Sequence, residues 1–254
     1  MGAKFTYKEY YLCFIDILGF SDHIVSLTKT KNDKGVKDTL RLIRELQNMQ
    51  AEMEDKGLWF NSFSDSIIIT TSADTVDNLD KLIWLTRDIL ARLILNRFLF
   101  RGAIVRDKLY RHNNAILGKA MIDAYLLESR IARHPRIILS QDTFNDARKL
   151  EMRKQKIRRD PDGPVSVHAL HWLENFKTAV LEGRITGYDQ KEQFAQISSI
   201  SAFLAEKINE FVDRPSIFEK YKWFIDYFNH AALEFPSNMR PNPWPPRIVI
   251  SDFF

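Results

Sequence analysis

Glycine is scarce in this chain. Only nine of the 254 residues are glycine, against about 18 at the average usage of roughly 7%. The sequence therefore has no loop of closely spaced glycines of the kind that cradles phosphate in a P-loop or a dinucleotide-binding fold. Gly118-Lys119 lacks the spacing and the following Ser or Thr of a P-loop. Any phosphate chemistry must rely on single glycines placed at turns.

Cysteine and long apolar runs are also nearly absent. The one cysteine, Cys13, allows neither an internal disulfide nor a thiolate metal site, which favours a reducing, cytoplasmic location. The most apolar stretch, residues 79–100, is interrupted by charges such as Lys81, Arg87 and Arg92, and the N-terminus has no apolar signal segment. We expect no membrane partner. The net charge of +4 is too small to indicate a nucleic-acid partner.

The first part of the chain predicts a buried strand followed by helices. Tyr10–Leu18 is a nearly continuous run of aromatic and β-branched residues with one acid, Asp16, near its end. Gly19 ends this strand. Apolar residues at helical spacing then predict helices over Phe20–Leu27 and Asp33–Lys56.

A hairpin and a second strand–helix unit come next. Strand-like segments at Leu58–Phe63 and Ser66–Thr71 are separated only by Ser64 and Asp65, which predicts a hairpin with a polar tip. An amphipathic helix at 78–96 and a strand at 98–105 follow. The resulting order, βαββαβ, predicts an α+β ferredoxin-like fold.

This topology has a chemical consequence for two acids. The end of the first strand and the tip of the central hairpin lie side by side in such a sheet, so we expect Asp16 and Asp65 to meet. Either acid alone is most simply a turn or capping residue. Two converging carboxylates repel one another unless a positive charge lies between them. Oxygen ligands of this kind suit Mg²⁺ or Mn²⁺, and the backbone N–H groups of the loop 17–21 could hold a phosphate.

The remainder of the chain predicts more mixed structure and then helices alone. The expected elements are helices at 117–133 and 141–148, strands at 136–139 and 165–172, and helices at 191–214 and 216–234. Five of the nine prolines crowd into residues 236–246. We therefore expect a core over residues 1–174 and a C-terminal helical, Pro-rich extension over 175–254, suited to a dimer-stabilising or regulatory cap.

Four segments resemble the signature blocks of class III nucleotidyl cyclase catalytic domains. They are FIDILGFSDHI (14–24), FNSFSDSIII (60–69), FRGAIV (100–105) and ILGKAMIDAYLLE (116–128). The resemblance covers about residues 10–128. It implies a ferredoxin-like cyclase core, a homodimer with its sites at the interface, and formation of a 3′,5′-cyclic nucleotide and pyrophosphate from a nucleoside triphosphate.

The resemblance also implies roles for individual residues. Asp16, Asp65 and the carbonyl of Ile17 would hold two metal ions, Mn²⁺ or Mg²⁺, at each site. The loop with Gly19, Phe20 and Ser21 would bind phosphate oxygens. Arg101, in the third block, would orient phosphate or brace the site, and an ordinary ion pair at the sheet edge is equally open.

Several positions depart from the family pattern. Ser64 replaces the usual glycine before the second metal aspartate, and Asn61 stands where the family reads a purine. The family's transition-state Asn and Arg fall on Ile122 and Leu126, which can neither donate a hydrogen bond nor carry charge. Loss of one such donor typically costs about 10² to 10³ in rate. Either other residues, such as Lys119, replace them, or the protein is catalytically silent.

One subgroup accounts for the missing purine contacts. The FSD hairpin, the RGAI strand and the ending G-x-A-x-x-x-A-Y-x-L-E are similar to the uridylate and cytidylate cyclases of bacterial Pycsar anti-phage systems. This resemblance implies conversion of UTP to cyclic UMP, with a separate effector that senses the product. Asn61 has both a donor and an acceptor for a pyrimidine. A cytidylate cyclase, a purine cyclase and a silent nucleotide-binding protein are the alternatives.

Overall fold

The structure is a computed structural model that describes residues 6–30, 33–54, 56–112, 115–150, 156–233 and 248. The chain divides into two compact units, Met1–His168 and Ala169–Phe254. The proline-rich residues 236–246 of the expected extension lie outside the described residues.

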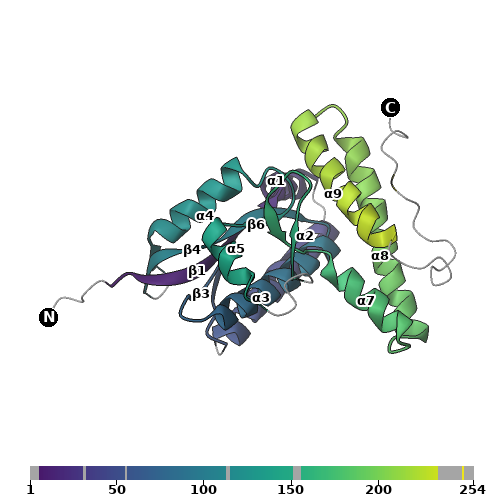
Figure 1. The fold of residues 1–254 in the computed structure, drawn as a ribbon. Coiled ribbons are helices and arrows are strands. Elements are labelled where there is room, and N and C mark those ends of the chain that lie inside the picture. The colour runs from purple at the N-terminus through teal and green to yellow at the C-terminus, as the bar shows by residue number, and fades with distance from the viewer. Residues whose placement is uncertain are drawn as a thin grey trace. The chain divides into compact units, whose positions relative to one another are not determined.

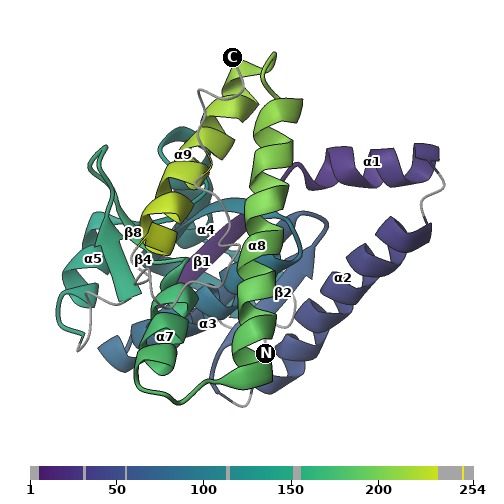
Figure 2. The same cartoon turned by 90° about the vertical axis from the view of Figure 1, so that its right-hand side faces the viewer.

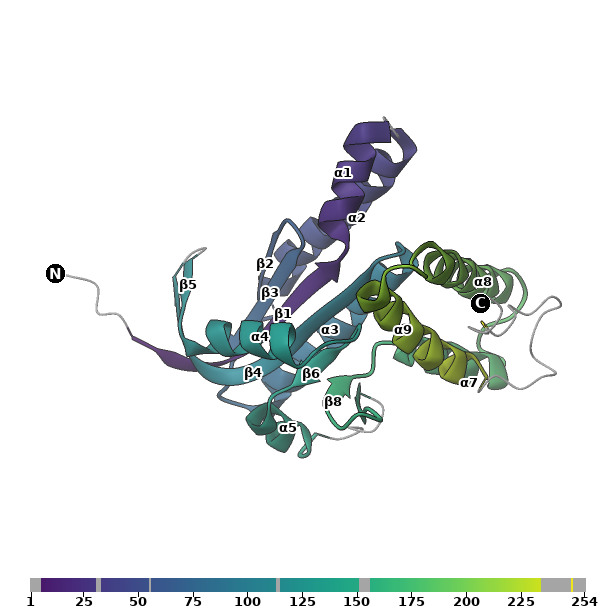
Figure 3. The same ribbon diagram turned by 90° about the horizontal axis from the view of Figure 1, so that it is seen from above.

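The N-terminal unit is built on an antiparallel four-stranded core. Its strands are β1 (Lys8–Leu18), β2 (Trp59–Phe63), β3 (Ser66–Ser72) and β4 (Leu99–His112), in the sheet order β2-β3-β1-β4. The connecting helices are α1 (Phe20–Thr30), α2 (Asp33–Glu54) and α3 (Val76–Leu95). This arrangement confirms the α+β, ferredoxin-like prediction, with two helices in the first crossover. Figure 3 shows α1 and α2 extending beyond the end of β1, and Figure 2 shows them inclined to one another.

Further strands widen this sheet beyond β4. The short strands are β5 (Ala115–Leu117), β6 (Ile137–Leu139), β7 (Ile157–Arg159) and β8 (Val165–Val167), and the described residues thus form an eight-stranded sheet. β6 is parallel to β4, β8 and β7 follow it, and β5 pairs with the far end of β4. Two helices, α4 (Lys119–Arg130) and α5 (Gln141–Ala147), flank β6 in the chain.

The strand register divides the core side chains between two faces of the sheet. Leu12, Phe14 and Asp16 of β1 share one face, and this face packs against α4 through its fully buried Ala120 and Ala124. The intervening residues of β1 face α3, where the Thr86 hydroxyl contacts the buried Cys13 thiol. Figure 1 shows α3 and α4 on opposite sides of the sheet. The alternation follows from the two-residue period of a strand.

Gly102 lets β1 and β4 pack at the position next to Arg101. A Cβ atom at residue 102 would lie 2.0 Å from the Phe14 carbonyl oxygen and 2.8 Å from the Ile137 side chain. Both distances are far below van der Waals contact, so only glycine fits without a backbone shift. This is one of the few positions at which the scarce glycine is required.

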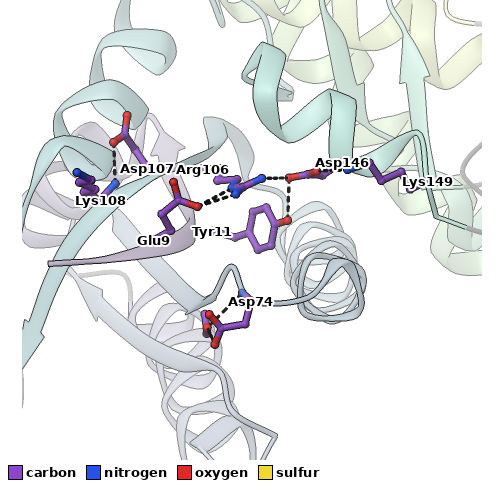
Figure 4. A network of polar contacts seen from close by, with 9 residues as sticks. Glu9, Tyr11, Asp74, Arg106, Asp107, Lys108, Asp146 and Lys149 are labelled. Carbon is purple, nitrogen blue, oxygen red and sulfur yellow. Dashed lines mark hydrogen bonds and ion pairs between the residues drawn. The ribbon is translucent and has the colours of Figure 1, made fainter.

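A polar network joins β1, β4 and α5 on the α3 side of the sheet (Figure 4). The Tyr11 hydroxyl donates to the buried Asp146 carboxylate at 2.9 Å, and Arg106 donates to the same carboxylate at 2.9 Å. Arg106 also bridges to Glu9, and Lys149 pairs with Asp146. Burial acts to raise the pKa of Asp146, but the hydrogen bonds from Lys149, Tyr11 and Arg106 lower it below its ordinary value. The network fixes α5 on the sheet.

The C-terminal unit consists of helices in the described residues. They are α7 (His171–Leu181), α8 (Gly187–Glu210) and α9 (Pro215–Leu233). α8 and α9 run side by side (Figure 1), and the hydroxyl of Tyr227 in α9 accepts a hydrogen bond from the backbone N–H of Leu170. None of the helices in the described part of the chain is both long and apolar enough to cross a membrane.

Two predicted elements are wrong at their ends. The strand expected at 165–172 stops at Val167, and α7, which was not predicted, begins at His171. The buried residues of α7 are Leu173, Phe176 and Ala179, which have helical spacing. Three positions in so short a segment did not predict a helix. The helix expected from Leu117 instead begins at Lys119, because residues 115–117 pair with the end of β4.

Candidate active site at the ends of β1 and the β2–β3 hairpin

The two aspartates predicted to meet lie at adjacent strand ends. Asp16 is opposite Ser66 in the antiparallel β1–β3 register, and Asp65, the residue before Ser66, lies at the hairpin tip beside the end of β1. The backbone N–H of Ile17 donates a hydrogen bond of 2.7 Å to the carbonyl oxygen of Asp65. Ser64, before Asp65, has φ of 56°, a left-handed conformation that suits the glycine usual in the resembling family. The sheet therefore places both acids at one edge.

The loop after β1 lies beside the acid pair. Gly19 has φ of 73°, and its carbonyl oxygen accepts the His23 N–H as α1 begins. The Ser21 hydroxyl lies 3.5 Å from Oδ2 of Asp65. The Phe20 side chain is buried against Phe98, with ring centroids 5.7 Å apart, so only its backbone can face a ligand. The loop thus brings Ser21 and the N-terminal end of α1 to the acids.

Arg101 occupies the other side of Asp16. The two residues are opposite one another in the β1–β4 register, and a guanidinium nitrogen of Arg101 lies 3.5 Å from Oδ2 of Asp16. The same guanidinium forms an ion pair with Glu128 of α4. Of the roles open for Arg101, the geometry supports bracing of the site through ion pairs.

Asn61 lies on the same face of the sheet as Asp16 and Arg101. It is opposite Ile68 of β3, which is in turn opposite Phe14 of β1. Strands are spaced about 4.8 Å apart and Phe14 is two residues along β1 from Asp16, so Asn61 lies roughly 12 Å from Asp16. Its half-buried side chain can contact a ligand that extends over β3 from the acid pair.

The donors at this edge fit a hard divalent cation. The N–H and C=O of one strand residue point to the same side, so the Ile17 carbonyl lies on the Asp65 side of β1. Two carboxylates and a carbonyl oxygen match the few protein ligands that Mg²⁺ uses when substrate phosphates complete its coordination. Among the residues that the structure describes, no group of three or more His, Cys, Asp or Glu side chains is placed to hold a metal.

Lys119 is not at the acid pair within one chain. It begins α4, and its ammonium group pairs with Asp107 at 2.7 Å and with Asp123 at 2.5 Å. These hydrogen bonds raise the pKa of Lys119. Burial acts to raise the pKa of Asp107, but the hydrogen bonds from the Lys119 side chain and the Lys108 backbone outweigh it, so the pKa is lowered. Asp107 is six positions along β4 from Arg101, or about 20 Å at the rise of a strand.

An open cavity of about 390 Å³ lies beside Lys119, between β4, α4 and α5. Its lining residues are Val105, Arg106, Asp107, Lys119, Asp123, Leu126, Leu127, Arg130, Ile131, Ser140, Gln141 and Asp142. Leu126, the position of the family's transition-state Arg, thus faces this cavity, whereas Ile122 is largely exposed. The cavity and the acid pair are separate places on one chain.

Sequence reasoning missed Glu128. Its carboxylate is buried on α4, whose buried residues are Ala120, Ala124 and Glu128. An acid that continues a four-residue repeat of small buried side chains is the signal that could have identified it. Because a buried carboxylate needs a partner, that spacing predicts a cation on the strand beneath.

No family model and no curated protein matches the chain. Solved structures similar to it include nucleotide cyclases. The catalytic core of a rhodopsin-guanylyl cyclase with converted specificity, in complex with ATPαS, is 16% identical over 63% of this chain and 95% of that chain, with a TM-score of 0.46. A bacterial light-regulated adenylyl cyclase is 15% identical over 65% and 92%, with a TM-score of 0.43. An adenylate/guanylate cyclase/hydrolase from Silicibacter pomeroyi is 15% identical over 64% and 95%, with a TM-score of 0.40.

Proposed function

We propose that this protein is a metal-dependent nucleotidyl cyclase that converts UTP to 3′,5′-cyclic UMP and pyrophosphate. The observation that carries the proposal is the meeting of Asp16 and Asp65 beside the Gly19 loop. Packing alone does not require two carboxylates at one edge. Their placement matches the two sequence blocks that resemble the cyclase family most specifically.

The proposed chemistry assigns a task to each group at this edge. Asp16, Asp65 and the Ile17 carbonyl would hold two Mn²⁺ or Mg²⁺ ions, which supply charge neutralisation of the triphosphate and activation of the ribose 3′-hydroxyl. The loop 18–21 offers backbone N–H groups to phosphate oxygens at the start of α1. The 3′ oxygen then forms a bond to the α-phosphorus as the bond to pyrophosphate breaks, and the hydroxyl proton passes to solvent.

Asn61 supports a pyrimidine substrate. Its amide can both donate to and accept from the edge of uracil or cytosine. A pyrimidine is smaller than a purine and needs fewer contacts, which agrees with Ala115 at the partner position of the family's purine pair. We choose uracil because the resembling subgroup includes more uridylate cyclases.

A homodimer would bring α4 of one protomer to the acids of the other. The exposed apolar side chains at the surface of this unit include Leu117 (64% exposed), Ile122 (60%), Tyr125 (54%) and, at the hairpin tip, Phe63 (80%). Ile122 and Tyr125 lie on α4 and Leu117 just before it, and exposed apolar side chains that cluster on one element mark interaction surfaces. In such a dimer Lys119, the first residue of α4, is a polar group that could take the place of the missing transition-state donors.

The biological role rests on the sequence resemblance alone. We propose that the cyclic product is a second messenger in anti-phage defence, sensed by a separate effector in the cytoplasm. We also propose that residues 175–254 are an extension of the cyclase core. A silent, nucleotide-binding protein is the second candidate, favoured by the apolar Ile122 and Leu126.

A product assay with matched variants tests the proposal. Purified protein is incubated with Mn²⁺ and each radiolabelled NTP in turn, alongside Asp65→Asn and the control Asp74→Asn, whose carboxylate lies beyond the other end of β3. We expect cyclic UMP from the wild type and the control, and its loss in Asp65→Asn. Cyclic CMP, or a purine product, would contradict the uridylate assignment, and no product from any NTP would favour the silent protein.

A further inference from the structure

Arg101 lies between two carboxylates of unequal burial. The Asp16 side chain is 23% exposed, the Arg101 side chain 22%, and the Glu128 side chain only 3%. A buried carboxylate that loses its partner is far more costly than a half-exposed one, because water cannot replace the partner. Glu128 is therefore the main partner of the Arg101 guanidinium, and Asp16 is its weaker partner.

The surroundings of Glu128 keep this anchor in place. Ala120 and Ala124 carry small side chains, so α4 packs closely on β1 and β4 and cannot carry Glu128 away from Arg101 without opening the core. On the strand side, Gly102 fixes β4 against β1 next to Arg101. Helix and strand thus hold the guanidinium at a set position beside Asp16.

We propose that Glu128 fixes Arg101 as a built-in counter-charge for Asp16, so that Arg101 and a divalent cation compete for the same carboxylate. The proposal rests on the proposed function, which places the cation there, and it makes Arg101 and Glu128 positioning residues. Like charges disfavour one another at close range. A cation at Asp16 is therefore repelled by the positive charge of Arg101, and the negative charge of Glu128 partly neutralises that repulsion.

Two variants separate this role from a merely structural one. Arg101→Met with Glu128→Gln removes the competing cation together with its buried partner, and Mn²⁺ binding should tighten by about threefold to tenfold. Glu128→Gln alone leaves the full charge of Arg101 facing Asp16, and binding should weaken by a similar factor. The free Mn²⁺ signal in electron paramagnetic resonance measures both without nucleotide. The double variant Arg92→Met with Asp88→Asn, an exposed pair on α3, is the charge-matched control and should bind as the wild type does.

The possible outcomes distinguish this inference from the cyclase proposal. Opposite shifts in the two variants support the inference, even if no cyclic product forms and the cyclase proposal fails. Weaker binding in both variants, as a loosened site would give, overturns the inference and leaves the cyclase proposal intact. No Mn²⁺ binding in the wild type or in either variant overturns the inference, whereas the cyclase proposal, in which substrate phosphates complete the coordination, is judged by the product assay.

A metal-free measurement checks the same ion pairs by unfolding. In EDTA, Asp16→Asn should destabilise the wild type, because Arg101 loses a partner. In the Arg101→Met with Glu128→Gln background the same change should destabilise the fold much less, because the Arg101 guanidinium that pairs with Asp16 has already been removed. Urea denaturation measures the change in unfolding free energy caused by Asp16→Asn. Equal changes in the two backgrounds would overturn the proposal that Arg101 is the counter-charge of Asp16.

Discussion

Ile17 and Asp65 are joined by a backbone hydrogen bond of 2.7 Å from the N–H of the first to the carbonyl oxygen of the second. This bond ties the end of the central strand to the tip of the hairpin. The backbones that carry Asp16 and Asp65 are therefore held together by strand pairing. A site held in this way is preorganised before any ligand arrives.

The strained hairpin tip predicts a stabilising substitution. Ser64 has φ of 56° at the first central residue of a two-residue turn, where glycine is favoured. We expect Ser64→Gly to raise the free energy of unfolding by up to about 1 kcal/mol. Urea denaturation measures the change. Ser66→Gly, in the neighbouring strand, should instead lower it by about 0.5–1 kcal/mol, and a gain from both variants would contradict the assignment of strain to Ser64.

The contact at Gly102 predicts a loss of both stability and activity. In Gly102→Ala the added methyl group would meet the Phe14 carbonyl at 2.0 Å, so β1 and β4 must separate. We expect a loss of about 2–3 kcal/mol, as for other overpacked cores. Cyclase activity should fall at temperatures where the variant is still folded, because the end of β1 that carries Asp16 is displaced. An unchanged unfolding midpoint would argue against the close packing.

The network around Asp146 predicts acid sensitivity. Its folded pKa is lowered, chiefly by hydrogen bonds that outweigh the opposing effect of burial. The ordinary pKa of an aspartate is about 3.9, so its stabilisation is complete above that value and is lost as pH falls through the lowered pKa of the folded state. The unfolding free energy of the wild type should fall below about pH 5. Asp146→Asn should be less stable at neutral pH and show a shallower acid limb, and parallel curves would contradict this.

The exposed apolar surface of α4 predicts a dimer that one charge can disrupt. Ile122→Asp should shift the protein towards monomer in light scattering after size exclusion, and should reduce cyclase activity together with dimerisation. Val25→Asp is the control, because Val25 is an exposed apolar residue on α1. A dimer that survives Ile122→Asp, or is lost equally in Val25→Asp, would show that α4 is not the interface.

The core topology could be predicted from the sequence, because hydrophobic period and turn residues determine it locally. The run Tyr10–Leu18, the two-residue tip at Ser64 and Asp65, and the apolar stripe of α3 each predict one element. Their order then brings Asp16 and Asp65 together. The predicted meeting of these two acids follows from strand pairing alone, so no side-chain detail was needed.

The contacts made across the sheet could not be predicted in this way. That Glu128 reaches Arg101 depends on the angle and depth at which α4 packs, which the pattern of one helix does not contain. The ion pair of Lys119 with Asp107 likewise depends on the register of β4, which the sequence of α4 does not contain. The predicted strand ran on to residue 172, into the start of α7, because an apolar run of a few residues fits a strand and a buried helix equally well.

The central position of β1 also bears on how the molecule is made. β1 is synthesised before both of its partners, β3 and β4, and β4 ends only at His112. Pairings between such distant segments form slowly, because the intervening chain must first be closed into a loop. A nascent chain that has been translated only to β3 carries both aspartates but lacks Arg101. A product truncated after β3 therefore has both carboxylates but lacks the guanidinium that pairs with Asp16.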